Sequence, residues 1–231
     1  MKQQIGELNE KSLHASLKAW YARPGDRVEV EVDGYVVDIL QDGQLIEIQT
    51  GNFSGVKEKF RRLARAHDLK LVYPIAQEKW LYKLPKADWE GPRRRKSPKR
   101  GRVEEIFREL VSFPDLLHSD QFTLEVVMIQ EEEVRKFTGR KMWWRNGWEP
   151  VERRLLQVLD QHIFHSPEDI GELLPEDLPV EFTTRDLAQA LNGPRWLGQK
   201  MAYCLRKVGF LTHVGKKGRS NLYIVSAAGR R

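Results

Sequence analysis

The chain has few of the features that mark secreted or membrane-embedded proteins. Among its 231 residues there is one cysteine, Cys204, which excludes an internal disulfide and a cysteine-based zinc site. The ordinary role of such a residue is that of a small buried apolar side chain. No apolar run reaches the roughly 18 residues of a transmembrane helix. The first residues, MKQQIGELNEK, lack the apolar stretch of a secretory signal. These absences predict a cytoplasmic protein without a membrane segment.

Positive charge is present but unevenly distributed. The formal net charge is +6. Residues 90–102 contain seven basic side chains and one acidic one, and residues 183–231 contain ten basic and one acidic. Two basic blocks separated by acidic segments predict local contacts with a polyanion. We expect nucleic acid as the partner, because membrane binding would require an amphipathic basic helix with a bulky apolar face.

Two carboxylates face each other across a predicted hairpin near the N-terminus. Asp42-Gly43 is a strong signal for a two-residue turn between two apolar runs. Folding about this turn sets Asp38 opposite Glu47, at a Cβ separation of roughly 4.5–5.5 Å where like charges are destabilising. A divalent metal ion between them is the simplest stabilising partner. The alternative is a solvated sheet face that also carries Glu29 and Glu31.

Apolar periodicity predicts the elements around this hairpin. In chain order, they are a helix over 9–21, strands over 28–32, 35–40 and 45–49, a helix over 53–67 and a central strand over 69–75. The residues expected on one shared apolar face of the meander are Val28, Val30, Val32, Tyr35, Val37, Ile39, Ile46 and Ile48. Glu10 lies within about 20° of the inward residue Leu17 on the first helix. If that helix packs on the acidic face, Glu10 joins Asp38 and Glu47, and Gln49 shares their face.

This order of elements, with Asp38 and the tripeptide Glu47-Ile48-Gln49 on adjacent strands, resembles the PD-(D/E)XK nuclease superfamily. The resemblance covers about residues 5–80. It implies that Asp38 and Glu47 bind Mg²⁺ or Mn²⁺ and that Glu10 is the acid contributed by the helix. The catalytic set would then be Glu10, Asp38, Glu47 and Gln49, which would act in metal-assisted phosphodiester hydrolysis.

Gln49 departs from the superfamily pattern, in which this position usually holds Lys. A neutral amide can orient an attacking water but supplies no positive charge to the phosphate. Lys57, near the inward edge of the second helix, is the candidate for that charge. The alternative is that the nuclease-like domain has lost its activity.

The middle of the chain is predicted as connecting structure. Its basic segment, which includes Arg93, Arg94, Arg95 and Lys96, is expected to be a linker or solvated loop that contacts phosphates. We further predict a helix over 103–112, a strand over 121–129 and an aromatic turn over 141–149. Trp143, Trp144 and Trp148 in that turn either stack on unpaired bases or pack between domains.

The C-terminal part resembles a winged helix-turn-helix domain over about residues 151–226. We expect a helix over 151–164, an irregular acidic insertion over 165–182, and helices over 185–191 and 195–208, the second of which would be the recognition helix. A strand–loop–strand wing would follow. The expected DNA contacts are Arg195, Gln199, Tyr203 and Arg206 on the recognition helix, and Lys216, Lys217 and Arg219 in the wing.

Together these patterns predict an α/β protein, with a restriction endonuclease-like αβββαβ core joined to a C-terminal winged-helix domain. The expected ranges are a nuclease-like domain over 1–89, a basic connecting region over 90–150 and a winged-helix domain over 151–231. The predicted function is a DNA nuclease dependent on Mg²⁺ or Mn²⁺. The alternatives are a non-catalytic DNA-binding protein or transcriptional regulator with a degenerate nuclease domain, and a protein-interaction module. Since many superfamily members act as dimers, the resemblance also allows a homodimer.

Overall fold

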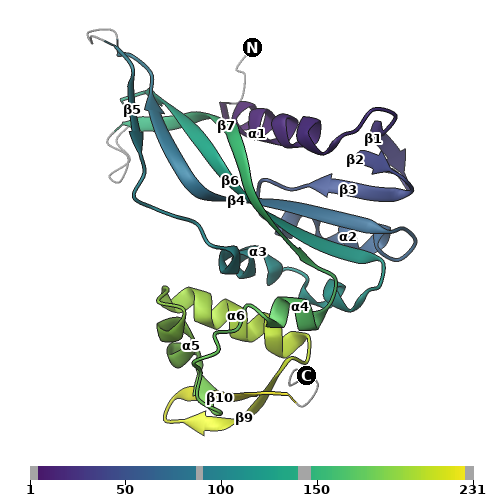
Figure 1. The fold of residues 1–231 in the computed structure, drawn as a ribbon, viewed down its shortest axis with the longest axis vertical. Helices are drawn as coiled ribbons and strands as arrows, with labels where there is room; N and C mark the ends of the chain where they lie inside the picture. The colour runs from purple at the N-terminus through teal and green to yellow at the C-terminus, as the bar shows by residue number, and fades with distance from the viewer. Residues whose placement is uncertain (1–4, 87–90, 140–146, 227–231) are drawn as a thin grey trace.

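The protein is a mixed α/β structure built on one large mixed sheet (Figure 1). The computed structural model describes residues 5–86, 91–139 and 147–226, with side chains from Ser12 onward in the first helix. The helices are α1 (Ile5–Tyr21), α2 (Lys57–Leu63), α3 (Phe107–Leu110), α4 (Pro167–Gly171), α5 (Thr184–Ala190) and α6 (Arg195–Lys207), with 3-10 helices η1 (Ser54–Val56), η2 (Val103–Ile106) and η3 (Pro114–His118). No helix in these ranges has both the length and the apolar character needed to cross a bilayer.

The large sheet has the strand order β1-β2-β3-β4-β6-β7. In addition, β5 pairs with the C-terminal end of β4. Its strands are β1 (Arg27–Val32), β2 (Tyr35–Gln41), β3 (Gln44–Ile48), β4 (Leu69–Lys83), β5 (Arg93–Lys96), β6 (Phe122–Phe137) and β7 (Trp148–Phe164). Strands β1 to β3 form an antiparallel meander, and β3, β4 and β6 run parallel. The predicted order of helix, three-strand meander, helix and strand is therefore present.

Both hairpins of the meander close with tight Asp-Gly turns, including the predicted turn at Asp42-Gly43. Asp33 and Asp42 have φ of 52° and 49°, and the glycines that follow them have φ of 79° and 88°. Positive φ at both central residues defines the turn that matches strand twist, and glycine adopts it without steric cost. The second turn pairs Gln41 with Gln44 and Leu40 with Leu45, which is the predicted register.

The meander is covered on both faces, so the prediction of a single apolar face is wrong. Leu13 and Leu17 of α1 pack with Ile39, Ile46 and Ile48 on one side. Val37 and Leu45 belong to the cluster that includes α2 on the other side. Helix α1 therefore covers an apolar face and not the face of Glu47. When both faces of a sheet are packed, apolar side chains that point to either face are buried.

Residues 151–164, predicted as a helix, belong to the long edge strand β7. The helical spacing of the apolar residues led to a wrong prediction because the pairing of β7 with β6 contains three register shifts. Such shifts disrupt the alternation of side chains expected of a strand. Leu155 packs on the apolar cluster that contains Leu13 and Leu17 of α1. In contrast, Leu156, Leu159 and Ile163 remain partly exposed. The expected range 151–231 thus includes one strand of the large sheet.

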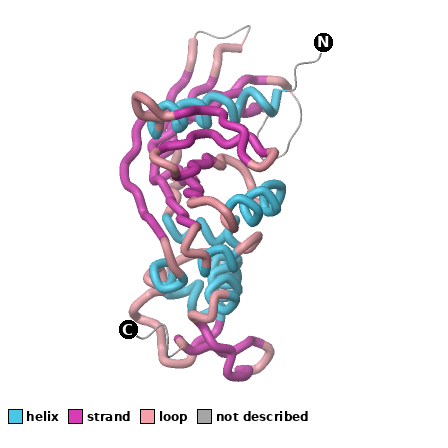
Figure 2. The backbone as a smooth tube through the Cα atoms, turned by 90° about the vertical axis from the view of Figure 1, so that its right-hand side faces the viewer, coloured by secondary structure: helices cyan, strands magenta, loops and turns pink. Residues whose placement is uncertain are grey.

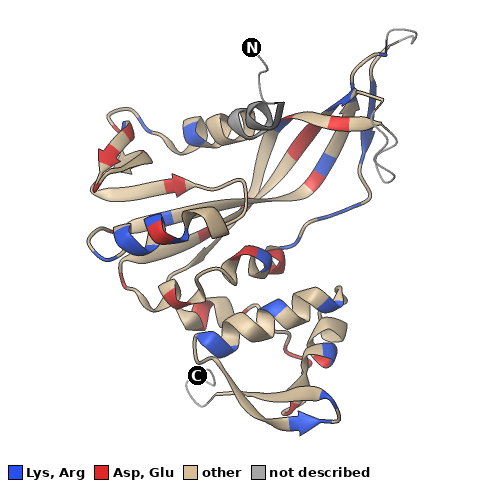
Figure 3. Cartoon of the chain, turned by 180° about the vertical axis from the view of Figure 1, so that it is seen from behind, with Lys and Arg blue, Asp and Glu red and all other residues tan. Residues whose placement is uncertain are grey.

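The predicted linker contains strand β5, which pairs antiparallel with β4. Arg94 donates to Glu132 at 2.7 Å and lies over the Trp80 ring, and Lys96 lies 2.8 Å from Glu78. Acidic side chains of the sheet and the β4 backbone thus order this segment. Figure 3 shows its basic residues running alongside the large sheet.

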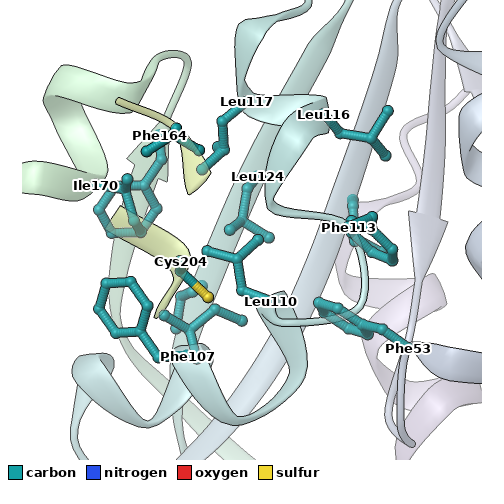
Figure 4. Packing of buried hydrophobic residues seen from close by; sticks show 14 of the residues in the cluster. Phe53, Phe107, Leu110, Phe113, Leu116, Leu117, Leu124, Phe164, Ile170 and Cys204 are labelled. Atoms are coloured by element: carbon teal, nitrogen blue, oxygen red, sulfur yellow. The ribbon is translucent and has the colours of Figure 1, made fainter. Parts of the chain in front are cut away.

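The C-terminal elements form a separate small sheet with the order β8-β10-β9 and helices α4 to α6. Its strands are β8 (Phe182–Thr183), β9 (Leu211–Lys217) and β10 (Ser220–Val225). A capping box of Thr183 and Asp186 begins α5. Buried Cys204 packs near Phe107 and Leu110 of α3 (Figure 4), so one continuous core joins the two parts. Figure 2 shows the large sheet and these elements stacked end to end.

Candidate functional site: a carboxylate pocket

Asp38, Glu47 and Gln49 line one pocket of about 380 Å³. The predicted carboxylate pair is therefore brought together at the open end of the β2–β3 hairpin. We call this the carboxylate pocket; its lining is His14, Val36, Asp38, Glu47, Ile48, Gln49, Thr50, Gly51, Val56 and Lys59. Helix α1 contributes to one side of the pocket and helix α2 to the other.

Asp38 is held by the backbone of the neighbouring strand and by α1. The Ile48 amide donates to Asp38 Oδ2 at 2.8 Å, and His14 Nε2 lies 3.1 Å from the same oxygen. Lys18 Nζ lies 3.6 Å from Asp38 Oδ1. Burial favours a higher pKa for Asp38, but these hydrogen bonds and cations outweigh it and hold the pKa below its usual value. Asp38 is therefore ionised at neutral pH.

Glu47 is 7% exposed and lies on the opposite side of β3 from the residues that contact α1. Lys59 of α2 donates to Glu47 and also, at 2.6 Å, to the Val36 carbonyl. Burial raises the pKa of Glu47 to about 7, and the charge of Asp38 adds to the rise, although Lys59 opposes it. Each carboxylate of the pocket therefore has a lysine ammonium beside it, Lys18 at Asp38 and Lys59 at Glu47.

The remaining predicted site residues differ in where the structure places them. Gln49 Nε2 donates to the Asn52 carbonyl at 2.9 Å, so its amide stabilises the following loop. Glu10 lies in α1, but its side chain is outside the part that the structure describes. Lys59, and not the predicted Lys57, is the α2 cation that lines the pocket. The sequence held a signal for this, because Lys59 follows Val56 at helical spacing on the inward side of α2.

The donor set fits Mg²⁺ better than a transition metal. In the ranges with described side chains, no group of three or more His, Cys, Asp or Glu residues could hold a metal ion. Mg²⁺ usually keeps several waters and needs only one or two protein carboxylates. Asp38 and Glu47 supply two carboxylates that line the same pocket. These two residues would hold the cation.

A second predicted surface is the exposed face of α6. The opposite face of the helix, formed by Leu197, Met201, Cys204, Leu205 and Val208, is buried. Arg195, Gln199, Tyr203 and Arg206 are exposed, and so are Lys216, Lys217 and Arg219 in the β9–β10 hairpin. A groove of about 410 Å³ separates the helix from the hairpin and is lined by Gln199, Tyr203, Arg206, His213, Asn221 and Tyr223.

The other predicted contacts are partly engaged within the protein. Of the four basic residues of β5, Arg94 and Lys96 pair with glutamates of the sheet, although all four remain exposed. Trp148 is buried beside Phe137, which fits packing and not base stacking. Trp143 and Trp144 lie outside the described residues.

The fold and the pocket together define a mixed α/β protein with a carboxylate pair, of which Glu47 is buried and Asp38 half-buried, at the end of a hairpin. The profile of a domain of unknown function, DUF8091, matches residues 11–165, and the chain belongs to this family. A protein of Treponema pallidum (strain Nichols) described as uncharacterized is 31% identical over 223 residues, which cover 95% of this chain and 86% of the relative. No solved structure matches the chain. The matched range contains every lining residue of the carboxylate pocket and ends beside the end of β7.

Proposed function

We propose that this protein is a DNA nuclease that depends on Mg²⁺ or Mn²⁺ and has its active site in the carboxylate pocket. The observation that carries the proposal is the convergence of Asp38, Glu47 and Lys59 in one open pocket at the end of the αβββαβ segment. Two carboxylates with a nearby lysine are the side chains that metal-assisted phosphodiester hydrolysis requires.

Each of these side chains has a defined task in the proposed reaction. Asp38 and Glu47 would hold the cation, which when bound lowers the pKa of water and neutralises phosphate charge. Lys59 lies where its ammonium can attract a substrate phosphate, which supplies the charge that Gln49 lacks. His14, beside Asp38, orients that carboxylate.

Isosteric variants test this proposal. Asp38→Asn and Glu47→Gln keep the shape of the pocket but remove its negative charge. We expect each to lower the cleavage rate of labelled DNA with Mg²⁺ or Mn²⁺ by at least about a hundredfold. The matched control is Glu31→Gln, an exposed glutamate of the same meander. Cleavage at the wild-type rate by both pocket variants would falsify the assignment.

The C-terminal elements support DNA binding in the same proposal. The order α4, β8, α5, α6, β9, β10 supports the interpretation of this part as a winged helix-turn-helix domain, in which α6 would be the recognition helix. The exposed Arg and Gln side chains of α6 suit base edges, and the basic hairpin suits phosphates. This surface would supply affinity for the duplex while the carboxylate pocket supplies the chemistry.

A second candidate function is non-catalytic DNA binding, and the contact of Gln49 favours it. The position that usually holds Lys is neutral here, and its amide is engaged by Asn52. Gln49→Lys separates the two candidates. If the wild type does not cleave DNA and Gln49→Lys does, the protein is a DNA-binding protein whose nuclease domain has lost its activity.

A further inference from the structure

A second pocket, of about 330 Å³, lies between β4, β6 and the segment that precedes η2. Five cationic side chains from different elements line it, together with only two carboxylates, Glu105 and Glu133. We call it the basic pocket; its cations are Lys79, Lys99, Arg108, Arg135 and Arg153. Because positive charge exceeds negative charge in a concave site, its ligand is expected to be an anion.

The internal ion pairs of the basic pocket leave two of its cations available. Lys79 and Arg153 lie 2.6 and 2.7 Å from oxygens of the fully buried Glu131, and Arg135 pairs with Glu133. Within the described ranges, neither Lys99 nor Arg108 has an acidic partner. Arg108 instead lies over the ring of Trp196, 4.4 Å from its centroid. The paired cations build the pocket, whereas Lys99 and Arg108 line it without a carboxylate among the described residues that neutralises their charge.

The rest of the lining is apolar and aromatic. Tyr73, Pro74, Ile75 and Leu81 contribute the apolar surface, and Tyr73 is fixed by an edge contact with Phe53 at 5.1 Å between ring centroids. A cationic site with an aromatic, apolar floor suits a phosphate that carries a sugar and an unpaired base. A duplex would present its phosphates there but keep its bases stacked inside.

The basic pocket and the carboxylate pocket are neighbours. Arg153 lines the basic pocket and donates to the Thr50 carbonyl at 3.4 Å, and Thr50 lines the carboxylate pocket. The loop after β3 therefore contributes to one pocket and contacts the wall of the other. The two pockets are therefore adjacent, with Arg153 and the loop after β3 between them.

We infer that the basic pocket binds the backbone of a single-stranded nucleic-acid segment whose continuation enters the carboxylate pocket. This inference rests on the proposed nuclease function and specifies its substrate as DNA with an unpaired stretch. Lys99 and Arg108 contact phosphates, and Tyr73 contacts the sugar or base.

The test measures binding separately from cleavage. The double variant Lys99→Gln/Arg108→Gln is prepared in the Asp38→Asn background, which prevents turnover. Its affinity for a labelled single-stranded oligonucleotide is measured by fluorescence anisotropy over a range of salt concentrations. The matched control, Arg27→Gln/Arg65→Gln, removes two exposed cations elsewhere on the same domain. Thermal unfolding of both variants verifies that each is folded.

We expect the pocket variant to bind the oligonucleotide about tenfold more weakly than its parent. The slope of log affinity against log salt concentration should become smaller by about 1.4. The control should leave both the affinity and this slope unchanged. Unchanged binding by a folded pocket variant would overturn the inference. Equal effects on a blunt duplex would overturn the single-strand assignment. If inorganic phosphate or a nucleoside monophosphate displaces the oligonucleotide completely and binds as tightly as the oligonucleotide does, the basic pocket is a small-anion site instead. If the wild type never cleaves DNA but the pocket variant binds weakly, the basic pocket stands and the nuclease function falls.

Discussion

Glu47 is a buried carboxylate that shares its pocket with a second carboxylate, and its protonation links the stability of the fold to pH. Burial raises its pKa from 4.5 to about 7. Because the folded pKa is the higher one, the contribution of Glu47 to stability is full below pH 4.5 and is lost as pH rises through 7. A cation bound between Asp38 and Glu47 would favour the ionised form of Glu47 and so lower its pKa.

Replacement of Glu47 by Gln removes this pH dependence. Relative to the variant, we expect the wild type to lose up to about 3 kcal/mol of unfolding free energy between pH 4 and pH 8. Urea denaturation at a series of pH values measures the difference. Mg²⁺ added at pH 8 should raise the stability of the wild type more than that of Glu47→Gln. Parallel pH profiles for the two proteins would contradict the assigned burial of Glu47.

At the scale of elements, the packing of α5 against α6 depends on the absence of a side chain at Gly198. A Cβ at this position would lie 2.5 Å from the Thr184 carbonyl oxygen and 2.8 Å from the Ala188 nitrogen. Both atoms belong to the backbone of α5, so neither can move without shifting that helix. The close approach of the two helices fixes how α6 presents its exposed face.

Gly198→Ala should therefore destabilise the protein by about 1–3 kcal/mol, even though alanine is the better helix former. Chemical denaturation provides the measurement. Gly55→Ala is the matched control, because nothing lies within 4 Å of a Cβ placed there. Equal stability of the two variants would show that the α5–α6 contact is looser than described.

The elements also show where sequence patterns failed. Strand β7 carries its apolar residues at helical spacing because bulges interrupt the ladder and because it lies at a sheet edge. Strand β5 reads as a linker because all four of its residues are basic. Pairing with β4 and ion pairs with glutamates on β4 and β6 make an extended conformation favourable there.

At the scale of the whole molecule, two groups of basic residues lie where DNA contacts are proposed. Figure 3 shows lysines and arginines along β5 and at the tip of the β9–β10 hairpin. The carboxylate pocket, the basic pocket and the α6 groove lie on parts joined by one continuous core. Contacts such as Lys200 to the Arg108 carbonyl, at 2.7 Å, connect α6 to the large domain.

The hairpin contribution to duplex binding is measured by its salt dependence. Replacing Lys216, Lys217 and Arg219 together by alanine should reduce the slope of log affinity against log salt by about 2 to 3. The matched control replaces Arg23, Arg27 and Arg65, which are exposed basic residues of the large domain. An unchanged slope in the hairpin variant, or an equal reduction in the control, would argue against duplex binding by this hairpin.

The sequence by itself determined the local features. Asp-Gly turns have few alternatives to a tight hairpin, so they set the register that brings Asp38 near Glu47. Helical periodicity likewise determined which face of α6 is buried. Both signals depend on neighbours close in the chain.

The tertiary structure decided everything that depends on distant partners. It selected Lys59 and His14 as the neighbours of the carboxylates, placed β5 and β7 in the sheet, and positioned Arg153 beside the loop of the carboxylate pocket. The physical reason is that burial and charge pairing depend on which segments pack together, and periodicity within one segment carries no information about its partners.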